Sequence, residues 1–131
     1  MATDISNESD IQLLVNTFYD RVKQDETIGY IFQQAIGEDW SHHLPIMYRF
    51  WGTILLHVEG YKGNVINKHI ELDKKIPLEK EHFNRWLQLW EGTVDDLFAG
   101  EVANEAKNRA SLMLHLISMK VEWARLGKSI L

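Results

Sequence analysis

The sequence predicts an all-α protein. Apolar residues recur at helical spacing along several long segments. Alternating apolar runs joined by Asn-Gly or similar turns, which mark β-hairpins, are missing. At 131 residues the chain has the length of one domain, so we expect residues 1–131 to form a single unit.

The first helix is expected from about Asn7 to Gln24, and Asn7 and Ser9 are both candidate N-caps. Ser9 with Gln12 also fits a capping box. The apolar residues with the spacing of one helix face are Ile11, Leu14, Val15, Phe18 and Val22. Tyr19 follows Val15 by four residues, so it is expected to point toward the same interior.

A short helical turn is expected around Ile28, Ile31 and Phe32, between Gly29 and Gly37. The next long helix is predicted from about Ser41 to Val58. Pro45 falls in its first turn, where a missing N–H has no partner to lose. Its apolar stripe is Met47, Phe50, Trp51, Ile54, Leu55 and Val58.

The second half begins with a short helical segment from Val65 to Leu72, followed by Asp73-Lys74-Lys75 as a polar connector. Pro77 is expected to open a long helix that ends at Gly100. Its predicted buried face is Phe83, Trp86, Leu87, Trp90, Val94 and Leu97. The last helix, from about Glu101 to Leu126, is expected to bury Val102, Ala106, Met113, Leu116, Ile117 and Val121.

Composition excludes several classes of function. A net charge of -5 without a basic stripe argues against a nucleic-acid partner. The absence of cysteine excludes a disulfide framework, an iron–sulfur cluster and a thiolate nucleophile. No signal-peptide pattern and no membrane-spanning apolar run are visible, so we expect a cytoplasmic protein without a membrane partner.

Six histidines are present, but the paired spacing typical of zinc sites is missing. A haem iron needs only one neutral imidazole and an apolar slot. His69 is a candidate, because Val65 and Ile66 lie one turn before it. His43 continues the apolar stripe that contains Met47, whereas His42 falls off it, so helix phase selects His43 as the inward histidine.

Each candidate also has an ordinary structural interpretation. From spacing alone, His69 is more often a surface histidine, and His43 can equally face water at a helix start. Tyr19 on an apolar stripe is more often a core tyrosine, and Trp51 and Trp86 are more often packing residues. We assign no role to the remaining histidines, His57, His82 and His115. By residue patterns alone, the chain is a helical domain of unknown activity.

A set of short motifs, taken in order, resembles the truncated haemoglobin family and specifically its third group. The resemblance covers nearly the whole chain, and the absence of Gly-Gly pairs, which other groups carry at helix ends, fits the third group. The motifs are Phe18-Tyr19-Asp20-Arg21-Val22, Gly29-Tyr30-Ile31-Phe32, Trp40 with His43 and Phe50-Trp51, Asn67-Lys68-His69 with Leu72, and Phe83-Asn84-Arg85-Trp86-Leu87.

The resemblance implies a shortened globin, a two-over-two helical sandwich that encloses haem b (iron protoporphyrin IX). His69 matches the proximal histidine that ligates the iron, and Tyr19 matches the distal tyrosine of the second globin helix. Trp86 matches the distal tryptophan of the helix after the proximal segment.

The same resemblance implies further pocket residues. His43 matches the distal histidine, and Phe32 matches the phenylalanine that packs on the porphyrin. Met47 and Trp51 occupy the next inward positions of the distal helix. By position, Lys68, Lys62 and Arg49 are candidate contacts for the haem propionates.

The implied function is reversible binding of O2 and other small iron ligands such as NO, CO and cyanide, with oxygen transport in the bacterial cytoplasm as its setting. One alternative is a haem enzyme for NO dioxygenation or a peroxidase-like reaction, served by an unidentified reductase. Another is a haem-free helical interaction module, which would be colourless and carry an exposed apolar patch.

Overall fold

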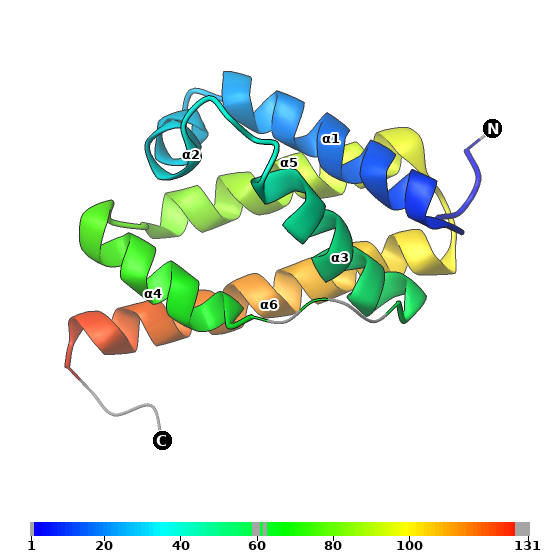
Figure 1. Ribbon diagram of the computed structural model, residues 1–131. Helices are drawn as coiled ribbons and strands as arrows, with labels where there is room; N and C mark the ends of the chain where they lie inside the picture. The colour runs from blue at the N-terminus through cyan, green and yellow to red at the C-terminus, as the bar shows by residue number, and fades with distance from the viewer. Residues whose placement is uncertain (1, 59–60, 62, 128–131) are drawn as a thin grey trace.

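The computed structural model describes residues 2–58, 61 and 63–127, and these residues form helices without any strand (Figure 1). The all-α prediction is therefore confirmed. The helices in chain order are α1 (Glu8–Gln24), α2 (Gly29–Ile36), α3 (His43–Leu56), α4 (Val65–Lys75), α5 (Lys80–Leu97) and α6 (Glu101–Arg125).

Two helix pairs form the body of the fold. α1 packs on α3, α5 packs along α6, and the pairs meet through α1 and α5 (Figure 1). The short helix α2 lies on α1, and α4 lies on α6. This is the two-over-two arrangement expected from the sequence, with α2 and α4 at one end.

Three tryptophan rings stack at the junction of the two pairs. Trp90 lies in the middle and is fully buried, with Trp51 stacked at 4.3 Å and Trp86 at 5.5 Å between ring centroids. The Phe18 and Trp90 rings are nearly perpendicular, with 5.1 Å between their centroids. The Trp90 indole N–H donates to the Ala106 carbonyl at 3.1 Å, so this buried polar group is satisfied by α6.

Of the expectations about helix ends, the Asn7 cap is confirmed and three others are wrong. The α1 cap is Asn7, whose side chain accepts from the Asp10 N–H at 2.9 Å, so the capping box on Ser9 does not form. The last turn of α4 is Asp73-Lys74-Lys75, predicted as a connector, because Asp73 is held by an ion pair. α5 begins three residues after Pro77, since Glu79 provides its N-cap.

Burial along α3 and α6 also differs from the prediction. Val58 is 37% exposed, because His57 ends α3 in the left-handed conformation. Leu116 is 43% exposed, because it falls off the buried face of α6. That face includes the predicted Ala106, Ile117 and Val121 but also Ala103, Ala110 and Leu114, which were not predicted.

Among the described residues, no helix is long and apolar enough to cross a membrane.

The start of α6 is capped from the far end of the chain. No side chain next to Gly100 caps this helix, and the Asp4 carboxylate instead accepts from the N–H groups of Val102 at 2.9 Å and Ala103 at 2.8 Å. Gly100 has a φ of 145°, and a Cβ there would lie 2.4 Å from Asp4 Cγ. The glycine thus makes room for the carboxylate.

We expect Asp4→Ala to lower the free energy of unfolding by about 1 kcal/mol at neutral pH, because N–H groups at the α6 terminus lose their acceptor. Burial alone would raise the pKa of Asp4, but hydrogen bonds from Val102, Ala103 and Ile5 outweigh it and lower the pKa. The carboxylate therefore stabilises the fold above its unfolded pKa of about 3.9, and this contribution is lost as pH falls through the folded pKa.

Urea unfolding of wild type and Asp4→Ala at pH 7 and at pH 3 measures this effect. The difference between the two proteins should shrink at the lower pH. Asp20→Ala removes an exposed carboxylate from α1 and serves as the control. Equal midpoints for wild type and Asp4→Ala at pH 7 would rule out the cap.

Candidate functional site

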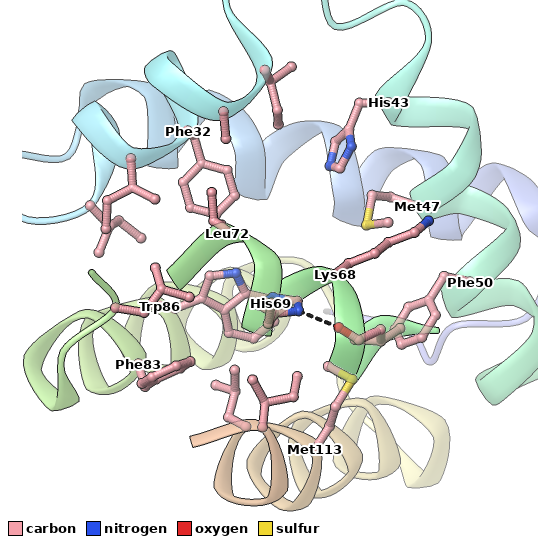
Figure 2. Close-up of a pocket in the computed structure, with 18 of the residues that line it drawn as sticks. Phe32, His43, Met47, Phe50, Lys68, His69, Leu72, Phe83, Trp86 and Met113 are labelled. Carbon is pink, nitrogen blue, oxygen red and sulfur yellow. Dashed lines mark hydrogen bonds between the residues drawn. The ribbon is translucent and has the colours of Figure 1, made fainter. Parts of the chain in front are cut away.

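A cavity of about 260 Å³ lies at the end of the fold that holds α2 and α4 (Figure 2). One water needs only roughly 10–15 Å³ of such space, so the cavity has room for a much larger ligand. Every described helix contributes to its wall, which is mainly apolar. The wall includes each predicted site residue: Tyr19, Phe32, His43, Met47, Trp51, His69 and Trp86.

His69 reaches the cavity from α4 (Figure 2). Its Nδ1 lies 2.7 Å from the Val65 carbonyl oxygen, one turn earlier in the same helix. A carbonyl can only accept, so Nδ1 carries the proton and Nε2 keeps its lone pair. Burial lowers the pKa of His69, and the bond to Val65 opposes this more weakly. The ring is thus a neutral imidazole whose Nε2 can ligate a metal.

His43 enters the cavity from the first turn of α3, while His42 is exposed (Figure 2). This is the choice that helix phase favoured. Burial, then the charge of Lys68, lowers the pKa of His43. Its Nε2 is buried and has no hydrogen-bond partner among the described residues. A buried polar atom left unpaired costs roughly 1–3 kcal/mol, so His43 marks a place where a polar ligand would be stabilised.

Tyr19 is 5% exposed, and aromatic rings of Phe18, Phe32, Trp40 and His43 surround it. Burial is the cause that raises the pKa of Tyr19, so the hydroxyl stays protonated and can donate a hydrogen bond. Within the described part of the chain, no hydrogen bond engages this hydroxyl.

Trp86 and Trp90 differ in how their indole N–H groups are used. The Trp90 N–H donates to the Ala106 carbonyl, and Trp90 does not line the cavity. Trp86 does line it, and no hydrogen bond between described residues occupies its N–H. Trp86 is therefore the tryptophan of α5 that can donate to a ligand in the cavity.

Comparison with known proteins identifies the family. No family model matches the chain. A curated relative, group 3 truncated hemoglobin ctb from Campylobacter jejuni subsp. jejuni serotype O:2, is 32% identical over 116 residues, which cover 86% of this chain and 89% of the relative. The chain belongs to the group III truncated haemoglobins.

A solved structure supports the same assignment. The crystal structure of group III truncated hemoglobin from Campylobacter jejuni superposes with a TM-score of 0.81 at 31% identity. The match covers 91% of this chain and 94% of that chain. The resemblance inferred from the ordered motifs, and the globin fold that it implied, are thus confirmed.

Truncated haemoglobins bind haem, and the cavity of this truncated haemoglobin suits such a group. Its wall is apolar over most of its surface, as a porphyrin requires. One neutral imidazole, His69, presents a free Nε2, and the buried Nε2 of His43 has no hydrogen-bond partner among the residues that the structure describes. Among the described residues, no three His, Asp or Glu side chains gather into a metal cluster.

The candidate propionate contacts fare differently. Lys68 lines both the cavity and a more open groove beside it, and its side chain extends toward Met47 (Figure 2), so it stays a candidate contact for an anionic edge of a ligand. Arg49 is exposed and lines neither space. Lys62 lies outside the described residues.

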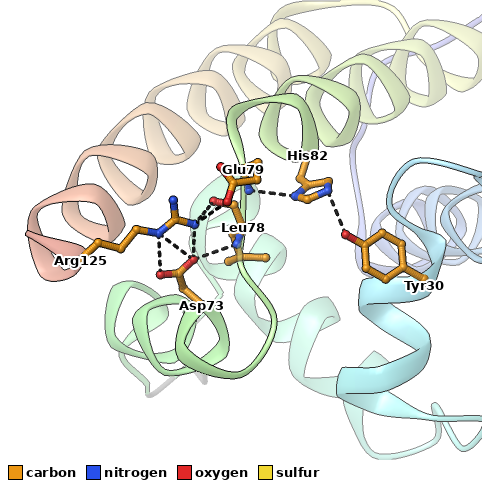
Figure 3. A network of polar contacts seen from close by, with 6 residues as sticks. All are labelled: Tyr30, Asp73, Leu78, Glu79, His82 and Arg125. Atoms are coloured by element: carbon orange, nitrogen blue, oxygen red, sulfur yellow. Dashed lines mark hydrogen bonds and ion pairs between the residues drawn. The ribbon is translucent and has the colours of Figure 1, made fainter.

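His82, to which the sequence reasoning assigned no role, lines the cavity of this truncated haemoglobin and is 8% exposed. Its Nδ1 accepts from the Glu79 N–H at 2.9 Å, so Nε2 carries the proton and donates to the Tyr30 hydroxyl at 3.1 Å (Figure 3). Glu79 and His82 have capping-box spacing, with histidine in the place of Glu or Gln. This spacing of Glu79 and His82 is the feature of the sequence that could have predicted a structural role for His82.

Two substitutions separate these bonds. His82→Gln places an ordinary capping-box residue at this position, so it keeps an acceptor for the Glu79 N–H but loses Tyr30, whereas His82→Leu loses both bonds. We expect His82→Gln to lower the free energy of unfolding by about 1 kcal/mol and His82→Leu to lower it by about 1 kcal/mol more. Combined with Tyr30→Phe in urea unfolding, His82→Gln should show that Tyr30→Phe no longer destabilises the protein. An equal cost of Tyr30→Phe in wild type and in His82→Gln would disprove the His82–Tyr30 bond.

Proposed function

We propose that this truncated haemoglobin holds haem b in the described cavity, with His69 as the proximal ligand. The observation that carries the proposal is the His69–Val65 hydrogen bond of 2.7 Å, which leaves Nε2 free and fixes the ring. The chain contains no cysteine for thioether attachment, which favours haem b over a covalently bound haem.

When bound, haem supplies an iron at which O2, NO, CO and cyanide bind reversibly. The chain's own side chains supply the enclosure. Phe32, Met47 and Trp51 offer apolar contact on the walls formed by α2 and α3. These contacts exclude water, which strengthens polar interactions inside the pocket.

Tyr19 and Trp86 are the proposed distal hydrogen-bond donors. The Tyr19 hydroxyl is kept protonated by burial, and no described residue accepts a hydrogen bond from the Trp86 indole N–H. Both can donate to a polar diatomic ligand and slow its release. Binding of O2 is therefore the leading function that we propose.

A second candidate is an enzyme for NO dioxygenation or a peroxidase-like reaction. It is favoured by His43, whose Nε2 has no hydrogen-bond partner among the described residues and whose ring centroid lies 5.7 Å from that of Tyr19. An imidazole with a free nitrogen at the cavity can hold or pass a proton, which reversible binding does not need. Continuous turnover would require a reductase as partner.

Stopped-flow mixing of the oxygenated protein with NO, and separately of the ferric protein with hydrogen peroxide, distinguishes the two candidates. Reversible O2 binding with slow NO and peroxide consumption supports a binding function. Rapid consumption that His43→Leu abolishes, with O2 binding intact, supports the enzyme and rejects simple O2 binding as the whole function.

A further inference from the structure

The helix that carries His69 buries an ion-paired carboxylate, while its apolar side chains are only partly buried. All residues of α4 are described, and its one buried residue is Asp73, at 8% exposed. Val65 and Leu72 are only partly buried, because they face the cavity. Apart from the cavity, α4 packs against α6. Asp73 is therefore the side chain of α4 that the protein encloses most completely.

Arg125 of α6 binds both the Asp73 carboxylate and the backbone of the connection that follows α4 (Figure 3). Its Nη2 lies 2.6 Å from Asp73 Oδ1, and its Nε lies 3.0 Å from Oδ2. The same Nη2 donates to the Leu78 carbonyl at 2.8 Å, while the Leu78 N–H donates to Asp73 Oδ1 at 2.8 Å. One guanidinium thus ties the end of α4 and the connection to α5 onto the end of α6.

Asp73 follows His69 by four residues, so the two side chains lie one turn apart on the same helix face. A shift or tilt of α4 at Asp73 would move the imidazole within the cavity. Resting on the proposed ligation by His69, we propose that Asp73 and Arg125 are positioning residues: their ion pair holds α4 on α6 and sets where His69 presents Nε2.

A second ion pair provides a matched control. Arg85 Nε lies 2.8 Å from Asp25 Oδ1, and the Asp25 and Arg85 side chains are 6% and 39% exposed, against 8% and 37% for Asp73 and Arg125. Asp25 also accepts from backbone N–H groups, those of Thr27 and Ile28 at 3.1 Å. This pair joins the turn before α2 to α5 and does not involve α4.

The test compares haem-loaded wild type with Asp73→Asn, Arg125→Met and the control Asp25→Asn. Resonance Raman of the ferrous, ligand-free proteins reports the iron–histidine stretch, and transfer of haem to apomyoglobin reports retention. We expect Asp73→Asn and Arg125→Met to broaden and lower the stretch and to speed haem transfer about 10-fold or more. Asp25→Asn should lower the melting temperature but leave the stretch unchanged.

Arg125→Lys keeps the positive charge, but an ammonium cannot bond both Asp73 and Leu78 in the geometry of the planar guanidinium. The frequency of its iron–histidine stretch should therefore fall between those of wild type and Arg125→Met. If Asp73→Asn does not fold, Arg125→Lys provides the test in its place. A wild-type stretch in Asp73→Asn or in Arg125→Lys, or an equal shift in Asp25→Asn, overturns the positioning role alone. A wild-type protein without an iron–histidine stretch overturns the proposed ligation as well.

Discussion

His69→Ala is expected to abolish the five-coordinate ferrous haem spectrum and to weaken haem retention by at least about 100-fold, beyond the range typical of losing an outer-shell partner. The variant removes a cavity imidazole whose ring is fixed by its bond to Val65 and whose Nε2 is free. His82 cannot replace it, because both of its nitrogens are engaged, by Glu79 and Tyr30.

His115→Ala is the control, since His115 is an exposed histidine on α6 and lies outside the cavity wall. It should keep the wild-type spectrum. His69→Gly in the presence of free imidazole should recover part of the spectrum, because the Val65 carbonyl can still accept from the added ring. If His69→Ala retained the wild-type ferrous spectrum, the proximal assignment would be wrong.

Tyr19→Phe is expected to speed O2 dissociation by about 10- to 150-fold, the equivalent of a hydrogen bond worth roughly 1.5–3 kcal/mol. Removing the hydroxyl leaves the ring contacts with Phe18 and Phe32, so the packing is kept. Trp86→Phe should act in the same direction through loss of its indole N–H. Stopped-flow replacement of O2 by CO measures both rates.

Tyr48→Phe is the matched control, because its hydroxyl bonds Asn16 and lies outside the cavity wall. Its O2 off-rate should equal that of wild type. Burial raises the pKa of Tyr19, so the difference between wild type and Tyr19→Phe should persist between pH 6 and pH 9. Unchanged off-rates in both Tyr19→Phe and Trp86→Phe would remove the proposed donors.

Helical periodicity predicted most of the fold because the long helices bury continuous apolar stripes. The stripe of α1 is buried as expected, from Ile11 to Val22. The prediction worked less well for α6, where Ala106 is buried as expected but Ala103 and Ala110 on the same face were missed. Alanine carries little apolar signal, although its small size lets neighbouring helices approach closely.

Periodicity also placed His43 toward the interior, but it could not single out His69. A lone histidine near a short helix has no distinguishing spacing, so the role of His69 came from the resemblance to truncated haemoglobins. The structure adds what local patterns could not contain. Asp4 caps α6 across 98 residues, and Asp73 meets Arg125 across 52. Both carboxylates look like ordinary surface residues in the sequence.

The most direct test of the central claim is the visible absorption spectrum of the purified protein supplied with haem, recorded in the ferric state, after reduction, and after addition of O2. We predict an intense band at the violet edge of the visible range, a five-coordinate ferrous spectrum on reduction, and a reversible change with O2. A colourless protein that takes up no haem would contradict the account and favour a haem-free helical interaction module.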